Sequence, residues 1–328
     1  MDADDAVVLA GVTRRFNGTL AVDDMSLRVA RGSIVGIIGP SGAGKTTGVR
    51  LMTGGLAPSS GRVRVLGEDP RSFRRRTRER IGYMPQQFTL YPDLTTGENV
   101  DFVASLFGLL WLRRRRRVRD VLRLVELWDV RGRRAGALSG GAQRRLELAS
   151  ALVHDPALFF LDEPTAGVDP LLRARIWDEL HRLRDAGRTL VVTTQYVSEA
   201  EECDRVALVA GGRLVAFAGP DSLRRDALGG EVIEVRTNVP LDASRIAGVS
   251  GVRGLRQTAP SVFLATVEDA GAATPDIVDA LAAEGAEAAS VREYRPSFDE
   301  VFAALVARAG APATTNPAAD RDPPARAA

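Results

Sequence analysis

The spacing of hydrophobic and polar positions changes along the chain, and each change predicts a different kind of element. Short apolar runs separated by turns predict strands at residues 6–9, 20–29, 33–38 and 62–66. From residue 94 onward, apolar side chains recur every three or four positions, which is the period of an amphipathic helix. The first part of the chain is therefore expected to combine a set of strands with a helical insert at about 94–150.

Two further apolar runs, 157–161 and 189–193, enclose a helical pattern at 171–184. A strand, a crossover helix and a second strand form the βαβ unit of a parallel sheet that is covered on both faces. These segments predict one α/β nucleotide-binding domain, which we place at residues 1–225.

Residues 230–308 have a different order of elements. Strands and helices are predicted in the order β-α-β-β-α-β with one more helix, at 231–237, 241–247, 252–257, 261–267, 275–284, 286–294 and 298–307. This order is ferredoxin-like and predicts a small C-terminal α+β accessory domain. Residues 309–328 hold Ala, Pro, Thr, Asn, Asp and Arg with almost no large apolar side chains, so they are expected to form a disordered tail.

Composition and charge narrow the class of protein. The chain has 328 residues, 45% of them hydrophobic and 26% charged, which is typical of a globular protein with more than one domain. Its 44 basic and 42 acidic residues give a net charge of +2, which argues against nucleic acid as a partner. The five consecutive arginines at 113–117 are interpreted as a solvated turn and helix start.

Cysteine usage and hydropathy predict the compartment. Cys203 is the single cysteine, so no intramolecular disulfide can form. The sequence has neither a signal-peptide pattern nor an apolar run of about 18 residues. We therefore expect a protein of the reducing cytoplasm that does not itself span a membrane.

A glycine-rich segment directly after the apolar run 34–38 matches the phosphate-binding loop G-x-x-x-x-G-K-[ST]. Its residues are Gly39, Pro40, Ser41, Gly42, Ala43, Gly44, Lys45 and Thr46, with Thr47 next in the following helix. Glycines let backbone N–H groups converge on phosphates, Lys45 is placed to reach the outer phosphates, and the Thr46 hydroxyl is placed to bind Mg²⁺. Lys45 is the only lysine among the 44 basic residues, which indicates a position that needs a compact ammonium ion.

Two carboxylates, Asp162 and Glu163, end the apolar run 158–161. Burying two carboxylates is costly without partners, so packing alone does not account for them. Beside a phosphate loop, Asp162 is expected to hold Mg²⁺ and Glu163 to orient an attacking water or accept its proton.

A second anion site is expected where Ser139, Gly140 and Gly141 precede the helix predicted at 144–152. With this segment, Leu138 to Gln143, the chain resembles the ATP-binding subunit of an ABC transporter over most of residues 7–223. The resemblance implies a P-loop NTPase fold of ABC type, in which an antiparallel β subdomain and a helical insert join the α/β core.

The resemblance also implies roles for single residues. Phe16 occupies the place of the aromatic that stacks on adenine, and Gln86 that of the glutamine that senses Mg²⁺ and water. Asp169 closes the loop 166–169, which is exchanged between subunits in this family. Two positions depart from the family pattern, because Ala142 replaces the usual signature glutamine and Gln195 stands where a switch histidine is usual.

Gln195 donates hydrogen bonds through its amide but cannot carry a proton, so hydrolysis should lack an imidazole titration near neutral pH. The order Thr193, Thr194, Gln195, Tyr196 resembles the daunorubicin-resistance type of drug-export ATPase. The segment 296–302 resembles the closing motif of the same subclass.

The function implied by the resemblance is ATP hydrolysis coupled to export of a drug, lipid or polysaccharide. One phosphate loop and one signature in the chain imply a head-to-tail homodimer that binds two ATP. A separate integral membrane permease would hold the chain at the cytoplasmic face of the membrane. Two alternatives stay open here: a soluble ABC ATPase acting on ribosomes or DNA, and a non-hydrolysing regulatory subunit, suggested by Gln195.

Overall fold

The computed structural model describes residues 4–310, and their contacts divide them into two compact units that meet between Phe217 and Ala218. Sequence patterning placed the boundary later, between residues 225 and 230. The residues between the observed and the predicted boundary form helix α7 (Pro220–Leu228), which packs against the last helix of the second unit. Residues 311–328, most of the predicted tail, lie outside the described part of the chain.

A six-stranded sheet in the order β5-β6-β7-β3-β8-β9 forms the centre of the first unit. The strands are β3 (Ile34–Ile38), β5 (Ile81–Met84), β6 (Leu158–Asp162), β7 (Thr189–Thr194), β8 (Arg205–Ala210) and β9 (Arg213–Ala218). The pairs from β5 to β8 are parallel, and every residue of β3, β6 and β7 is buried. Parallel strands bring their carboxyl ends to one edge of the sheet, so the loops after β3, β5, β6 and β7 gather there.

A three-stranded antiparallel sheet in the order β2-β1-β4 forms the predicted β subdomain. Its strands are β1 (Asp5–Phe16), β2 (Thr19–Ala30) and β4 (Ser60–Val65). The β1–β2 hairpin turns at Asn17 and Gly18, which both have positive φ, as a two-residue hairpin requires. Buried side chains of both sheets form one hydrophobic cluster, so this subdomain and the parallel sheet share a core.

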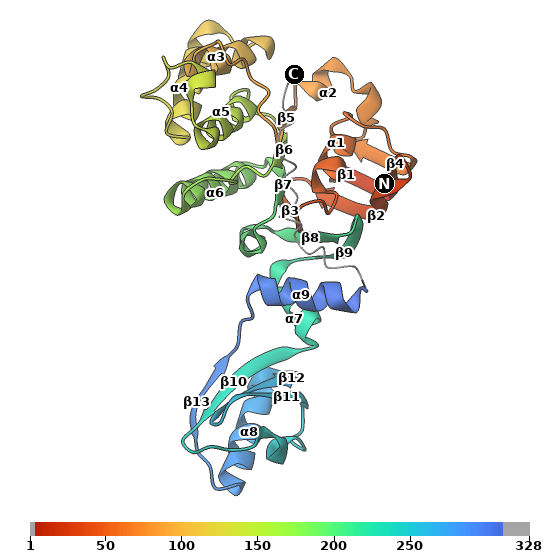
Figure 1. Cartoon of the computed structure of the whole chain (residues 1–328), viewed down its shortest axis with the longest axis vertical. Coiled ribbons are helices and arrows are strands. Elements are labelled where there is room, and N and C mark those ends of the chain that lie inside the picture. Colours follow the sequence, from red (N-terminus) through yellow and green to blue (C-terminus); the bar gives the residue numbers. More distant parts are fainter. Residues whose placement is uncertain (1–3, 311–328) are drawn as a thin grey trace, which may run out of the picture. The chain divides into compact units, whose positions relative to one another are not determined.

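The first unit has helices on both sides of the parallel sheet (Figure 1). They are α1 (Lys45–Met52), α2 (Arg75–Arg78), α3 (Thr96–Leu106), α4 (Trp111–Leu124), α5 (Gly140–Leu152) and α6 (Pro170–Asp185). Helix α1 lies on the side of the antiparallel strands, whereas α3 to α6 lie on the other side (Figure 1). Short 3₁₀ helices occupy Pro70–Ser72, Ala135–Ala137 and Val197–Glu202.

The arginine run in the helical insert lies in a helix and not in a turn. Helices α3 and α4 of the insert are separated by a turn at Gly108, which has a positive φ of 71°. The arginines at 113–117 do not form that turn, because α4 already begins at Trp111. No helix among residues 4–310 is long and apolar enough to cross a membrane.

The second unit is an antiparallel sheet in the order β11-β12-β10-β13. Its elements are β10 (Glu231–Thr237), a 3₁₀ helix (Ala243–Ile246), β11 (Val252–Ala259), β12 (Val262–Val267), α8 (Ala270–Ala283), β13 (Ala288–Glu293) and α9 (Phe298–Arg308). Each helical connection passes over one strand, which is the split βαβ pattern of the predicted ferredoxin-like arrangement. The unit has its own hydrophobic core between this sheet and α8.

Two helix boundaries in this unit differ from the predicted ones. The segment 241–247 forms only a four-residue 3₁₀ helix, which the side chain of Asp242 caps by accepting from Ser244 N at 2.9 Å. Helix α8 begins five residues before Pro275, because Asp269 caps it and accepts from Ala272 N at 2.8 Å. Proline favours the first turn of a helix, but here it lies inside the helix.

Candidate nucleotide site

The phosphate loop leaves no room for a side chain at two of its positions. A Cβ on Gly39 would lie 2.1 Å from the carbonyl oxygen of Val209, and one on Gly44 would lie 2.3 Å from that of Ala21. Gly44 also has a φ of 97°, in the left-handed region that disfavours other residues. Close packing against β8 and β2 therefore fixes the loop before any ligand binds.

Lys45 begins α1 and is buried beneath this loop. Its ammonium donates to the carbonyl oxygens of Gly39 at 2.7 Å and Pro40 at 3.0 Å, and lies 3.8 Å from Oε1 of Glu163. Burial lowers the pKa of Lys45, while the negative charges of Glu163 and Asp162 act in the opposite direction. The single lysine of the chain is thus a buried cation at the junction of the loop and the carboxylates.

The two carboxylates at the end of β6 are organised by one hydroxyl, that of Thr193 on β7. This hydroxyl donates to Oδ1 of Asp162 and accepts from the backbone N–H of Glu163 at 3.0 Å. Register places Asp162 opposite Thr193, so the contact follows from strand pairing. Glu163 leaves the strand with a positive φ of 56°, which turns its side chain toward Lys45.

Two glutamines reach the phosphate loop from neighbouring strand ends. Gln86, after β5, accepts a hydrogen bond from the Thr46 hydroxyl at 3.3 Å. Gln195, after β7, accepts one from the Ser41 hydroxyl at 3.2 Å. Both glutamines are exposed, so their amides are open to solvent and to a ligand.

The donor set here fits Mg²⁺. Oδ2 of Asp162 is buried and has no hydrogen-bond partner among the described residues, which is costly for a carboxylate unless a cation binds there. The side-chain oxygens of Thr46 and Gln86 are of the same hard donor type. Mg²⁺ usually takes one or two protein carboxylates together with waters and substrate phosphates, so one buried aspartate suffices.

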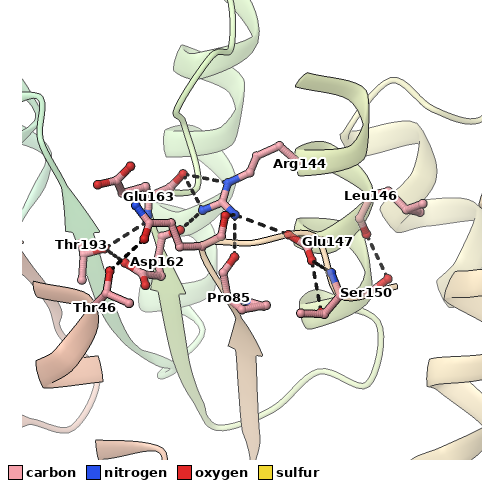
Figure 2. A network of polar contacts seen from close by, with 11 residues as sticks. Thr46, Pro85, Arg144, Leu146, Glu147, Ser150, Asp162, Glu163 and Thr193 are labelled. Atoms are coloured by element: carbon pink, nitrogen blue, oxygen red, sulfur yellow. Dashed lines mark hydrogen bonds and ion pairs between the residues drawn. The ribbon is translucent and has the colours of Figure 1, made fainter. Parts of the chain in front are cut away.

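Arg144, in the first turns of α5, joins the loops around this site (Figure 2). Its guanidinium donates to the carbonyl oxygens of Pro85 at 2.5 Å and Gln86 at 2.8 Å, on the loop after β5. It also donates to the carbonyl oxygens of Asp162 and Glu163, the latter at 3.1 Å. One side chain therefore fixes the backbone of three predicted site residues.

Glu147 lies one turn further along α5 and pairs with Arg144 at 3.4 Å. It is buried, accepts from the backbone N–H of Thr89 at 2.6 Å, and also bonds the Thr89 hydroxyl at 3.2 Å. Burial raises the pKa of Glu147, against the opposing hydrogen bonds from Thr89 and the charge of Arg144. The two residues together attach α5 to residues 85–89.

The signature residues begin the same helix. Ser139 is the N-cap of α5 and accepts from Ala142 N at 3.4 Å. Ser139 and Gly140 are exposed, and a Cβ on Gly141 would lie 3.2 Å from the carbonyl oxygen of Gly167. Within residues 4–310 no hydrogen bond or ion pair joins these three signature residues to the phosphate loop.

Two other predicted residues also stand apart from that loop. Asp169 is the N-cap of α6 and accepts from Leu172 N at 3.0 Å, so it has a structural contact of its own. Phe16, at the end of β1, is exposed, and the Arg14 guanidinium lies 4.5 Å from the centre of its ring. Neither bonds the phosphate loop in the described part of the chain.

Sequence reasoning missed the roles of Arg144, Glu147 and Thr193. One signal for the pair was present, because Glu147 is a lone carboxylate among Leu146, Leu148 and Ala149, the buried positions of α5. A charge in that setting needs a buried partner, and three residues earlier is one of the positions that face it. Thr193 offered no signal, because threonine is an ordinary strand residue.

Comparison with known proteins gives matches over most of the chain. The family model described as ABC transporter matches residues 22–166. The daunorubicin resistance ATP-binding protein DrrA3 of Streptomyces coeruleorubidus is 36% identical over 302 residues, covering 92% of this chain and 95% of that protein. The Nod factor export ATP-binding protein I of Rhizobium sp. (strain N33) is 38% identical over 231 residues, covering 70% and 76%.

Solved structures give matches that are confined to a smaller share of the chain. The dimeric structure of MJ0796, a bacterial ABC transporter cassette, is 27% identical with a TM-score of 0.61, and it covers 65% of this chain and 98% of the cassette. A dimeric post-hydrolysis state of the same cassette, bound to ADP and Pi, has a TM-score of 0.60.

Proposed function

The chain belongs to the ABC transporter family of ATP-binding proteins, and from that premise we propose that it hydrolyses ATP to power export through a separate membrane permease. The observation that carries the proposal is the convergence of Lys45, Asp162 and Glu163 at one sheet edge, where a buried carboxylate oxygen of Asp162 has no hydrogen-bond partner within residues 4–310. The names of the relatives, which concern daunorubicin resistance and Nod factor export, support export as the direction of transport, and the cargo proposed from the sequence is a drug, lipid or polysaccharide.

Binding of ATP is assigned to the phosphate loop and to Phe16. Gly39 and residues 41–44, with Thr46 and Thr47, would present backbone N–H groups and hydroxyls to the phosphates at the positive end of α1, while Pro40, which has no N–H, shapes the loop. Lys45 would exchange its loop carbonyls for phosphate oxygens. Phe16, exposed on β1, would stack on adenine with the face that Arg14 leaves open.

Hydrolysis is assigned to Glu163, with Gln86 and Gln195 as polar groups around the outer phosphate. Asp162, Thr46 and Gln86 would hold Mg²⁺, which neutralises phosphate charge when bound. Glu163 is directed toward the phosphate loop and would orient the attacking water and take up its proton. Gln195 would donate its amide N–H to the γ-phosphate, in place of a histidine.

The active form would be a head-to-tail homodimer at the cytoplasmic face of the membrane. One chain has one phosphate loop and one signature, and the signature residues 139–141 are exposed or half-buried and not bonded to the loop of their own chain. A second copy would supply its signature to close each ATP site, and Asp169 would lie in the loop exchanged between the copies. The related cassette MJ0796 forms a dimer, which supports this arrangement.

The site also bears on the alternative of a non-hydrolysing regulatory subunit. That alternative rested on Gln195 alone, and Gln195 contacts the phosphate loop through Ser41. Retention of Glu163 and of the buried Asp162 favours hydrolysis. A role on ribosomes or DNA has no support from the exporter names of the relatives.

Steady-state ATPase activity tests the proposal, with the chain measured alone and with its candidate permease. Wild type should hydrolyse ATP and Glu163→Gln should not, although it should still bind ATP. Gln195→His should introduce a titration near neutral pH that wild type lacks. If wild type binds ATP but is inactive even with the permease, while Gln195→His restores turnover, the chain is a regulatory subunit.

A further inference from the structure

Four large apolar side chains lie exposed together where α3 ends and α4 begins. Their exposed fractions are 64% for Leu106, 81% for Leu110, 59% for Trp111 and 74% for Leu112. We name these four residues the apolar tip. Single exposed apolar side chains are common on proteins, but four along seven residues form a patch that calls for a partner.

The arginine run beside the apolar tip divides into two groups. Arg114 pairs with Asp101 of α3 at 2.9 Å, and Arg117 donates to the carbonyl oxygens of Leu152 at 2.7 Å and Val153 at 3.1 Å. These two arginines hold α4 against α3 and against the end of α5. They therefore fix the direction in which the apolar tip projects.

The other three arginines, Arg113, Arg115 and Arg116, are exposed beside the apolar tip. Arg115 lies over the Trp111 ring at 4.9 Å, and the only acidic neighbour of Arg116 in the described structure is Asp120 at 3.7 Å. The first amides of α4 add partial positive charge, because its N-cap is Leu110, which offers no side-chain acceptor. The rim of the patch is thus positive.

We propose that the apolar tip and its three exposed arginines bind the surface of an anionic lipid bilayer. Leucine and tryptophan enter the interface between headgroups and acyl chains, while arginines contact the phosphate groups above it. Pairing two tips from two copies of the chain would bring six arginines together, which opposes self-association there. A nucleic-acid backbone offers charge but no apolar phase for the leucines.

This surface would act beside the permease and independently of nucleotide. Helix α4 would orient the first unit on the membrane through the lipid itself, before or after the permease binds. Binding of the chain to lipid does not require ATP hydrolysis, so the two can be tested separately.

Sedimentation with vesicles tests the proposal on the full chain without nucleotide. Phosphatidylcholine vesicles with about one third phosphatidylglycerol should bind the chain, and pure phosphatidylcholine vesicles should not. Changing Arg113, Arg115 and Arg116 together to Gln should weaken binding about 100-fold, and Leu110→Ser with Leu112→Ser about 10-fold. Far-UV circular dichroism of each variant verifies that it folds.

Helix α2 provides a matched control, since Arg75, Arg76 and Arg78 are equally exposed but have no large exposed apolar neighbour in residues 71–80. Changing these three to Gln should leave vesicle binding nearly unchanged. Equal loss in both arginine triples would overturn the proposal in favour of a diffuse basic surface. Absence of vesicle binding, or equal binding to neutral vesicles, would overturn it as well.

Discussion

At the residue scale, the site depends on side chains that fix the backbone of others. Arg144 donates to carbonyl oxygens on the loop after β5 and on the loop after β6. Thr193 joins Asp162 and Glu163 through one hydroxyl. Such residues act by positioning, so their removal should change turnover more than ATP affinity.

Arg144→Met should lower kcat about 100-fold with little change in ATP affinity, because the carbonyl oxygens it holds orient Gln86 and Glu163. Arg144→Lys should recover part of the loss, since an ammonium can satisfy fewer carbonyls. Steady-state kinetics with nucleotide titration measures both. Arg145→Met is the control, because Arg145 bonds Val125 O at 3.0 Å, away from the site, and its loss should leave kcat unchanged.

Because His154 is partly buried, we expect the free energy of unfolding to fall as the pH becomes acidic. It stacks on Phe107 at 3.6 Å, and burial lowers its pKa to about 4. The unfolded chain protonates this histidine near its ordinary value of about 6.5, so between those values unfolding takes up a proton. Stability should therefore fall by up to ~3 kcal/mol as the pH drops from 6.5 toward 4.

Urea unfolding of wild type and His154→Gln across that pH range measures the effect. The variant should be less stable at neutral pH, because it loses the stacking on Phe107. Its free energy of unfolding should depend less on pH between 6.5 and 4 than that of wild type. His181→Gln, which removes the other histidine from a more open position beside Glu202, is the control. If the free energy of unfolding falls equally with pH in wild type and in His154→Gln, the loss of stability at acid pH does not come from His154.

At the element scale, the sequence predicted the strands and helices that build the site. The loop at 39–46 and the carboxylates at 162–163 lie at strand ends. There the apolar run predicts the strand, and the residues directly after it carry the motif. The helix ends in the second unit were predicted less well, because Pro275 resembles a first-turn residue whereas Asp269 supplies the cap. The contacts of Arg144 join segments far apart in the chain, and no local pattern encodes such contacts.

Pro275→Ala should stabilise α8 by ~1–2 kcal/mol. Proline inside a helix lacks the N–H that would bond the carbonyl oxygen four residues earlier, that of Gly271, and its ring crowds that turn. Part of the gain is offset because alanine leaves the unfolded chain more freedom. Calorimetry of the full chain measures the shift, and a variant that melts lower than wild type would show that the ring packs favourably.

At the scale of the whole molecule, each of the two units has a separate hydrophobic core. The predicted nucleotide residues all belong to the first unit, and the ferredoxin-like sheet is the second. Sequence patterning placed the boundary between residues 225 and 230, at the end of α7, because the helix itself carries no sign of which core it joins. Its packing against α9 decides that.

Thermal unfolding should show two transitions, and ATP with Mg²⁺ should raise the midpoint temperature of only one of them. A ligand present at about 100 times its Kd stabilises the unit that binds it by ~2.7 kcal/mol. Pro275→Ala should shift the other transition alone, which identifies it. One transition that ATP raises as a whole would show instead that the two units unfold together.

The positive φ of Glu163 has a consequence for selection. A residue other than glycine in that conformation costs the fold ~1 kcal/mol, so Glu163→Gly should relieve backbone strain while it removes both the carboxylate proposed for hydrolysis and the negative charge 3.8 Å from the buried Lys45. The melting temperature of Glu163→Gly therefore weighs the backbone strain of one residue against the loss of a charge beside a buried cation. A strained glutamate at this position is what we expect where stability and the proposed turnover make opposite demands on one residue.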